Sequence, residues 1–140
     1  MTSFSEARRS AVLRLREAGI DSPGTEADLL LSGATGLSRA ALLVHLPDAM
    51  EDDLYDEFMK MVKRRCVREP IQYILRSWEF YGHTLEVQPG VLIPRQDTEI
   101  LVEIALSLIP ERGRFLDWGT GSGCLPLAML SARAGLSAVA

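Results

Sequence analysis

Residues 115–123 constrain the fold of this chain more than any other stretch, because they join a short apolar strand to a turn with glycine at every second position. The order is Phe-Leu-Asp-Trp-Gly-Thr-Gly-Ser-Gly, and the apolar segment 125–130 that follows is typical of the first turns of a helix. Glycine adopts left-handed backbone angles without strain and lets a ligand approach the main chain closely. The free N–H groups at the start of a helix add hydrogen-bond donors. The stretch therefore predicts a strand, a turn and a helix that bind a nucleotide-type cofactor.

The spacing of the glycines separates two kinds of cofactor. A dinucleotide fingerprint requires G-x-G-x-x-G, whereas this turn has G-x-G-x-G with Asp117 two residues before the first glycine. The turn resembles the first motif of class I S-adenosylmethionine-dependent methyltransferases. A cationic sulfonium favours a nearby carboxylate, and the turn contains no lysine. The alternatives are a turn without a ligand and an NAD-type site. The resemblance implies cofactor contacts for the acid and the whole turn: Asp117, Gly119, Thr120, Gly121, Ser122 and Gly123.

Composition limits the class of protein. With 140 residues and 47% hydrophobic content, the chain can form one domain or two small ones. A net charge of −4 argues against a general nucleic-acid binder, so we expect no direct nucleic-acid binding. No apolar run is long enough for a membrane span, and the N-terminus has no apolar signal core. Cys66 and Cys124 are far apart, and neither histidine has a partner at ligand spacing, so we expect a cytoplasmic protein with reduced thiols and no metal site.

The first half of the chain predicts short helices. Ser3 and Glu6 match a capping box, Pro23 is suited to the first position of a second helix that ends before Gly36, and Ser38 can cap a third. A fourth begins within residues 48–53. Four amphipathic helices with short connections should pack as a bundle of about 70 residues. Since none carries a catalytic cluster, residues 1–72 are interpreted as a helical substrate-recognition domain.

The charges of the fourth helix are ordered along its length. Acidic residues occupy its beginning and basic residues its end, within residues 60–68, which complements the helix macrodipole. A solvated, dipole-matched face is the favoured interpretation. The alternative is a basic surface that contacts an acidic or RNA-bearing partner.

Residues 73–90 predict a β-hairpin linker. Trp78, Phe80, Leu85 and Val87 alternate with polar residues around a turn at 81–84. No basic residues interleave with the two aromatic ones, so we interpret them as packing anchors and not as a platform for nucleic-acid bases.

A further helix is expected after Pro94. Asp97 or Thr98 can cap it, and Pro110 stops it. The apolar spacing predicts one inner face for this helix, made of Leu101, Ile104, Ala105 and Leu108.

Four strings taken together resemble the HemK/PrmC family of protein-(glutamine-N5) methyltransferases: residues 69–74, 79–82, 89–99 and 116–123. The helical opening also suits that family. By this resemblance the segment 94–99 closes over the cofactor opposite the glycine turn, which makes Arg95, Thr98 and Glu99 candidate pocket residues. The resemblance implies S-adenosyl-L-methionine as cofactor and peptide-chain release factors as partners, with methylation of the glutamine side chain in their Gly-Gly-Gln motif.

The chain departs from the family in one important respect. The Asn-Pro-Pro-Tyr loop that positions the glutamine amide does not occur in it, so we assign no catalytic residue. Smaller departures are Arg76, where the family tends to have glycine, and Pro126. We expect the N-terminal part of a longer enzyme, with an α + α/β fold: the helical bundle, the hairpin linker, and at 91–140 the incomplete beginning of a class I, Rossmann-like methyltransferase domain. The alternatives are an amino-group methyltransferase acting on DNA adenine or another protein, and a non-catalytic release-factor-binding module.

Overall fold

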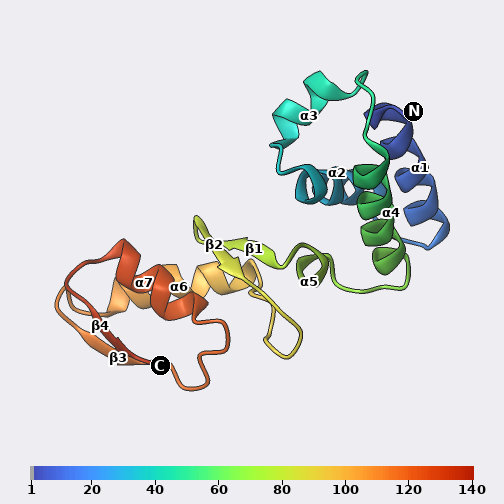
Figure 1. Ribbon diagram of the computed structural model, residues 1–140. Helices are drawn as coiled ribbons and strands as arrows, with labels where there is room; N and C mark the ends of the chain where they lie inside the picture. The colour runs from blue at the N-terminus through green and yellow to red at the C-terminus, as the bar shows by residue number, and fades with distance from the viewer. Residues whose placement is uncertain (1) are drawn as a thin grey trace. The chain divides into compact units, whose positions relative to one another are not determined.

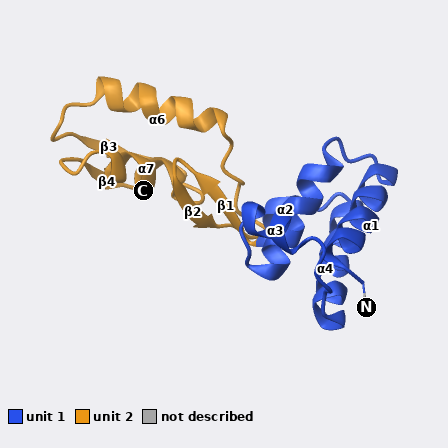
Figure 2. Cartoon of the chain, turned by 90° about the horizontal axis from the view of Figure 1, so that it is seen from above, with its two compact units in different colours: residues 1–75 blue, residues 76–140 orange. Residues whose placement is uncertain are grey.

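The computed structural model describes residues 2–140, which form a mostly helical chain with two small sheets (Figure 1). It divides into two compact units, residues 1–75 (unit 1) and residues 76–140 (unit 2), shown in different colours in Figure 2. Unit 1 contains α1 (Phe4–Glu17), α2 (Pro23–Thr35), α3 (Arg39–His45), α4 (Asp52–Cys66) and α5 (Ile71–Leu75). Unit 2 contains β1 (Ser77–Phe80), β2 (His83–Glu86), α6 (Asp97–Leu108), β3 (Arg114–Leu116), α7 (Cys124–Ala132) and β4 (Ser137–Val139).

Three helices of unit 1 begin where local sequence signals predict, whereas the N-caps of α2 and α4, Ser22 and Glu51, make no side-chain cap hydrogen bond. Ser3 Oγ accepts a hydrogen bond from the Glu6 N–H, and Glu6 Oε2 accepts one from the Ser3 N–H, which confirms the capping box. The second helix begins at Pro23 and ends at Gly36, whose φ of 71° places it in the left-handed region. Ser38 caps α3 through a bond from the Ala41 N–H.

The core of unit 1 lies where α1, α2 and α4 pack against one another, and α5 adds to it against α2 and α4. Phe58 and Val62 of α4 are fully buried there, together with Leu15 of α1 and Leu30 and Leu31 of α2. No single helix within residues 2–140 is long and apolar enough to cross a membrane; by length and composition alone α2 and α3 together could, but they bend by 87° at their break.

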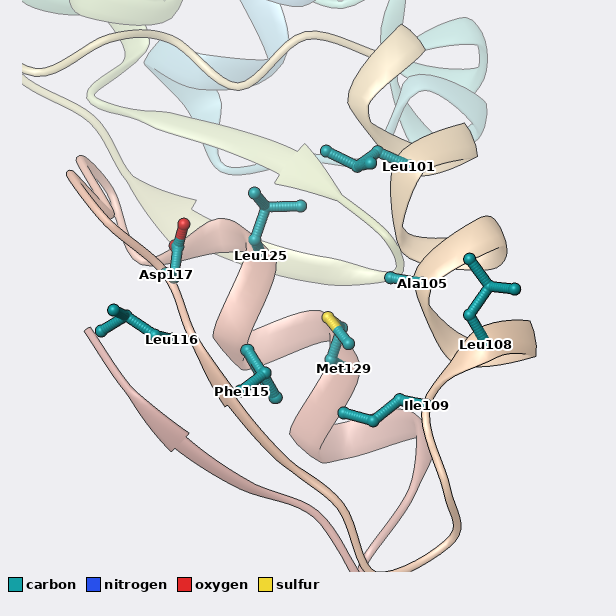
Figure 3. Close-up of a pocket in the computed structure, with 9 residues that line it drawn as sticks. All are labelled: Leu101, Ala105, Leu108, Ile109, Phe115, Leu116, Asp117, Leu125 and Met129. Carbon is teal, nitrogen blue, oxygen red and sulfur yellow. The ribbon is translucent and has the colours of Figure 1, made fainter.

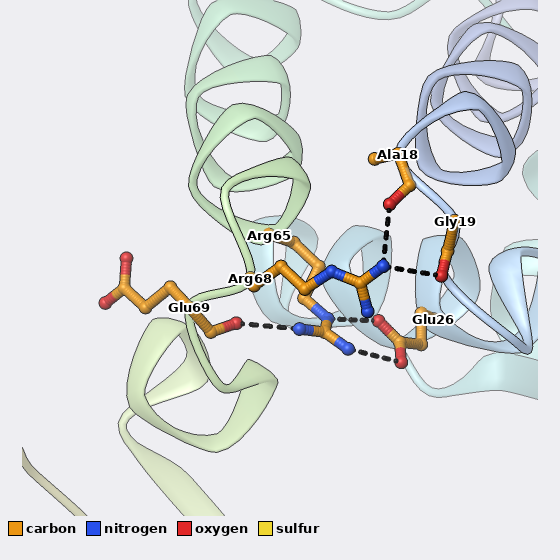
Figure 4. Close-up of polar contacts among 6 residues, drawn as sticks. All are labelled: Ala18, Gly19, Glu26, Arg65, Arg68 and Glu69. Carbon is orange, nitrogen blue, oxygen red and sulfur yellow. Dashed lines mark hydrogen bonds and ion pairs between the residues drawn. The ribbon is translucent and has the colours of Figure 1, made fainter.

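Arg65 in the last turn of α4 and Arg68 just after the helix bind other segments of unit 1 (Figure 4). Arg65 forms a bidentate pair with Glu26 of α2 and also donates to the main-chain oxygen of Glu69 at 3.1 Å. Its hydrogen bonds to Glu26 raise the pKa of the Arg65 guanidinium above its ordinary value. Arg68 Nη2 donates to the main-chain oxygens of Ala18 and Gly19 after α1, at 3.2 and 3.1 Å. These basic side chains therefore serve contacts inside unit 1, which neither interpretation of the charge order anticipates.

The hairpin of unit 2 has the predicted position. Strands β1 and β2 pair antiparallel, with Trp78 opposite Leu85, and the turn between them has positive φ at both Tyr81 (50°) and Gly82 (74°). Two consecutive positive φ values are the signature of a type I′ turn, whose twist matches that of the strands. Phe80 and Leu85 are buried in the core of unit 2.

A parallel strand pair forms the other sheet. β3 pairs with β4 so that Phe115 lies opposite Ala138, and α7 connects them, as parallel strands require. Ahead of β4, Gly135 lies so close to the main chain before β3 that a Cβ at this position would come within 2.4 Å of the Glu111 carbonyl oxygen. The main-chain segments that lead into the two strands are therefore closely packed, and only glycine fits at position 135.

Helix α6 differs from the prediction in its cap and in its buried face. Its N-cap is Gln96, which makes no side-chain cap hydrogen bond, so the expectation that Asp97 or Thr98 caps the helix is wrong. Val102 is the fully buried residue of α6, and Ala105, Leu106 and Ile109 pack on the same core. The exposed members of the expected inner face are Leu101, Ile104 and Leu108, the last 78% exposed. Because α6 carries apolar residues on nearly every side, its periodicity did not identify the face that packs.

Candidate functional site

The glycine turn between β3 and α7 presents bare main chain. Gly119, Gly121 and Gly123 have φ of 77°, 58° and 73°, a region that side-chain-bearing residues enter only with strain. A Cβ built at the first or third of these glycines meets nothing within 4 Å, so space adjoins the backbone at both. Gly123 is also the N-cap of α7, which directs the N-terminal end of that helix toward the turn. The turn can therefore receive a ligand against its main chain.

Two polar atoms beside this turn are buried and have no hydrogen-bond partner among the described residues: Asp117 Oδ2 and Thr120 Oγ1. The main chain at Asp117 is fixed, because its N–H donates to the Val139 oxygen at 2.8 Å and so continues the strand pair. A buried polar atom without a partner is costly, and native structures rarely leave one unexplained. The end of β3 and the turn after it thus contain a buried carboxylate oxygen and a buried hydroxyl whose hydrogen-bonding capacity is unused.

An apolar cavity of about 410 Å³ lies between α6, β3 and α7 (Figure 3). Asp117 is its one charged lining residue, and the glycines of the turn do not line it. The cavity can accept apolar groups next to a carboxylate, but it is not by itself a cradle for a polar cofactor. Its walls come from all three elements: Leu101, Ala105, Leu108, Ile109, Phe115, Leu116, Asp117, Leu125 and Met129.

The other predicted site residues occupy two places. Thr120 and Ser122 lie in the glycine turn, directly after Asp117. Arg95 and Thr98 lie where the chain enters α6, and the Thr98 N–H donates to the Arg95 oxygen at 3.0 Å. None of the three residues Arg95, Thr98 and Glu99 lines the cavity, but Leu101 of the same helix does, opposite Asp117. The structure thus brings α6 and the end of β3 to one cavity.

Glu99 has a partner that sequence reasoning missed. Its Oε1 accepts a hydrogen bond from the Tyr81 N–H at 2.8 Å, and the Tyr81 hydroxyl donates to Glu103 Oε1. The bond to Glu103 raises the pKa of the Tyr81 phenol above its ordinary value of 10.0. Glu99 and Glu103 are four residues apart, and that spacing, which places two acids on one helix face, was the available signal.

Within residues 2–140 no group of three or more His, Cys, Asp or Glu residues could hold a metal ion. Cys66 and Cys124 are free thiols.

Comparison with known proteins places this geometry in a family. The PrmC N-terminal domain family matches residues 6–75, half of the chain. The release factor glutamine methyltransferase of Geobacter sulfurreducens is 43% identical over 115 residues, which cover 82% of this chain and 40% of that protein. That of Nitratidesulfovibrio vulgaris is 39% identical over 133 residues, 94% of this chain and 45% of that protein.

A third relative, the bifunctional methyltransferase of Rickettsia prowazekii, is 34% identical over 137 residues, 84% of this chain and 26% of that protein. The chain spans less than half the length of these curated relatives. A helical unit that matches the PrmC N-terminal domain, followed by the segments shared with named release factor glutamine methyltransferases, shows that the chain belongs to the PrmC family.

Proposed function

We propose that this chain carries the recognition domain and part of the cofactor pocket of an S-adenosyl-L-methionine-dependent release factor glutamine methyltransferase. The observation that carries the proposal is the pair of buried, unpartnered atoms at Asp117 and Thr120 beside a bare glycine turn. The names of the relatives support the substrate, the glutamine side chain of a peptide-chain release factor. In this proposal residues 1–72 recognise the substrate, residues 73–90 link, and residues 91–140 begin a Rossmann-like domain.

The residues present fit the cofactor. Asp117 supplies a buried carboxylate for a cationic group, Thr120 supplies a hydroxyl, and the turn from Gly119 to Gly123 leaves room for close approach to the main chain. Ser122 lies in the same turn, and the further candidates are Arg95, just before α6, and Thr98, in its first turn. S-adenosyl-L-methionine supplies the methyl group when bound. The parallel β3–α7–β4 unit supports the Rossmann-like assignment, since glycine turns of this kind follow the first strand of such units.

The contribution of these residues is to bind and orient. An amide nitrogen is a poor nucleophile, so its methylation depends on alignment with the methyl group and on acceptors for the amide N–H groups. Those acceptors belong to the Asn-Pro-Pro-Tyr loop of the family, which this sequence does not contain. The chain therefore supplies the cofactor side of the reaction and no catalytic residue.

Two experiments test the proposal. Isothermal titration calorimetry of S-adenosyl-L-methionine into the 140-residue chain should give saturable binding that Asp117→Asn weakens about tenfold, because the variant loses the charge beside the cation. For activity, residues 1–140 are joined to the part of the Geobacter sulfurreducens relative that follows its matched segment. This chimera should transfer labelled methyl groups to a release factor glutamine, and label on DNA or on no substrate at all would contradict the proposal.

A second candidate function is a binding module that docks a release factor without using the cofactor. The observation in its favour is that the family match, residues 6–75, coincides with a unit that has its own closed core. In calorimetry a module would bind release factor while S-adenosyl-L-methionine gives no heat. An effect of S-adenosyl-L-methionine on release factor affinity would instead favour the enzyme.

A further inference from the structure

The turn of the β1–β2 hairpin is fastened to α6 by two acids of that helix. Glu99 Oε1 accepts the Tyr81 N–H at 2.8 Å, and Glu103 Oε1 accepts the Tyr81 hydroxyl. The two acids lie one helical turn apart, on the same face of α6. One residue of the turn thus meets the helix through both its main chain and its side chain.

The hydrogen bond from the Tyr81 N–H to Glu99 gives a partner to a main-chain donor that the hairpin leaves unpaired. Phe80 and His83 are the last paired residues of the hairpin, so Tyr81 is the first of the two turn residues and its N–H takes no part in the strand ladder. A carboxylate that accepts such an N–H makes a charge-assisted hydrogen bond, which is shorter and stronger than a neutral one. Glu99 therefore fixes the turn and the first turn of α6 to each other.

Fixing that part of α6 also fixes a wall of the cavity. Leu101, two residues after Glu99, lines the cavity together with Asp117. Thr98 directly precedes Glu99, and its N–H donates to the oxygen of Arg95, which lies three residues earlier. The two hydrogen bonds from Tyr81 tie the first two turns of α6 to the hairpin, while Ile100, Leu101 and Ile104 of the same part of the helix are exposed.

We propose that Glu99 is a positioning residue: it holds the start of α6 against the hairpin, so that the segment facing Asp117 is formed before the cofactor arrives. This inference rests on the proposed function for its cofactor part. It also changes the role that the family resemblance implies for Glu99, from a residue that touches the cofactor to one that acts through Tyr81 and α6.

The variants Glu99→Gln and Glu99→Ala separate these two roles. The glutamine side chain keeps an oxygen that accepts the Tyr81 N–H but has no charge, whereas alanine removes the acceptor altogether. A positioning residue should be rescued by glutamine. A direct ligand of a cationic group should lose its effect in both variants, because it needs the charge of the carboxylate.

The first measurement is amide hydrogen exchange by NMR on the 140-residue chain, without cofactor. The Tyr81 N–H should exchange about tenfold faster in Glu99→Ala than in the unchanged chain, and within about threefold of it in Glu99→Gln. Glu103→Gln is the matched control, because it alters the hydroxyl contact and leaves the N–H bond in place. Equal Tyr81 exchange in the unchanged chain and Glu99→Ala overturns the proposal. If Glu99→Ala does not fold, the Tyr81 amide proton resonance decides: it should move upfield in Glu99→Gln, and no movement overturns the proposal.

The second measurement is the dissociation constant for S-adenosyl-L-methionine by calorimetry. Glu99→Ala should weaken binding about tenfold, and Glu99→Gln should stay within about threefold of the unchanged chain. Equal losses in both variants overturn the positioning role in favour of direct contact. Absence of binding to the unchanged chain overturns the proposed function, and the exchange result then decides the structural role of Glu99 on its own.

Discussion

The two units differ in how completely they bury their apolar side chains and pair their buried polar atoms: unit 1 does both more completely, and unit 2 leaves some of each without a partner. In unit 1 the large apolar residues at the helix contacts are fully buried, and the arginines at the end of α4 have partners within the unit. In unit 2 one stripe of α6 is exposed, Trp118 is 90% exposed, and two buried polar atoms at the end of β3 have no partner. Both units expose some apolar residues, since Leu43 and Val44 of α3 are also accessible. The buried polar atoms without partners, by contrast, belong to unit 2 alone among the described residues.

Unit 1 therefore has a closed core, whereas unit 2 has apolar side chains and polar atoms that could still be covered or paired. A bundle with a closed core buries its large apolar side chains within itself. A sheet of two parallel strands with an apolar helix beside it is usually covered on both faces in larger domains. The curated relatives are more than twice as long as the parts that this chain matches.

The largest expected effect tests the core of unit 1. Phe58→Ala should lower the free energy of unfolding by about 3–5 kcal/mol, because it removes a fully buried ring and leaves a cavity. Urea denaturation followed by circular dichroism measures the loss. Leu43→Ala is the control, with a change within about 0.5 kcal/mol because that side chain is exposed. Similar losses in both variants would mean that unit 1 is not the closed unit described here.

The next effect concerns the pair between Arg65 and Glu26, whose side chains are 17% and 18% exposed. Glu26→Ala should cost about 1.5–3 kcal/mol, since it leaves a mostly buried guanidinium without its partner. Glu69→Ala breaks the more exposed pair with Arg64, and there the loss should be about 0–1 kcal/mol. The same unfolding measurement compares them, and the reverse order would remove the special role of the Arg65 contact.

An orphaned hydroxyl predicts a gain in stability. Thr120→Val in unit 2 should stabilise the chain by about 1 kcal/mol, because it removes a buried oxygen without a partner, and should weaken cofactor binding. Thr35→Val is the matched variant in unit 1. There the hydroxyl donates to the Leu31 oxygen at 2.8 Å, so the same replacement should destabilise by about 1 kcal/mol. Two losses would show that Thr120 has a partner after all.

The exposed stripe of α6 should matter for association and hardly at all for folding. Ile104→Gln combined with Leu108→Gln should change the free energy of unfolding by less than about 1 kcal/mol, because both side chains are exposed. The double variant should bind less of a hydrophobic fluorescent dye. Val102→Gln, on the buried face, is expected to disrupt unit 2. Unchanged dye fluorescence would indicate that the stripe is already covered.

The smallest effect is a shift in ionisation. A difference titration between the unchanged chain and Tyr81→Phe, followed by tyrosinate absorbance, should have its midpoint above 10.0, and Glu103→Gln should lower that midpoint. Because the pKa is raised in the folded state, the bond contributes stability below the ordinary tyrosine pKa, and this contribution is lost as the pH rises through the raised one. A midpoint that Glu103→Gln leaves unchanged would contradict the contact.

The sequence predicted best what depends on neighbouring residues. The Ser3–Glu6 capping box and the start of α2 at Pro23 are set by local geometry, and both are confirmed. The hairpin turn, predicted at 81–84, is shorter: it consists of Tyr81 and Gly82, and strand β2 begins at His83. Local signals also located the glycine turn, whose left-handed backbone follows from its glycines.

Contacts between distant segments were beyond local patterns. Helix α6 offers two apolar stripes, and only the packing of the hairpin and α7 against it selects the one around Val102. The bond between Glu99 and Tyr81 joins residues 18 positions apart, and the left-handed φ of Arg68 (69°) belongs to a residue type with no preference for it. Such features depend on the tertiary arrangement, which residue spacing does not encode.

The close approach of Gly135 to the Glu111 carbonyl oxygen makes the start of the parallel strand pair more tightly packed than its end. At the start of the strands there is no free space, because even a methyl group at Gly135 would force the two main chains apart. At the opposite end, where Asp117 is followed by the glycines of the turn, a Cβ at Gly119 or Gly123 would meet nothing within 4 Å. The strand pair is thus closely packed at its start and has open space beside the main chain at its end, where the unpartnered Asp117 Oδ2 lies.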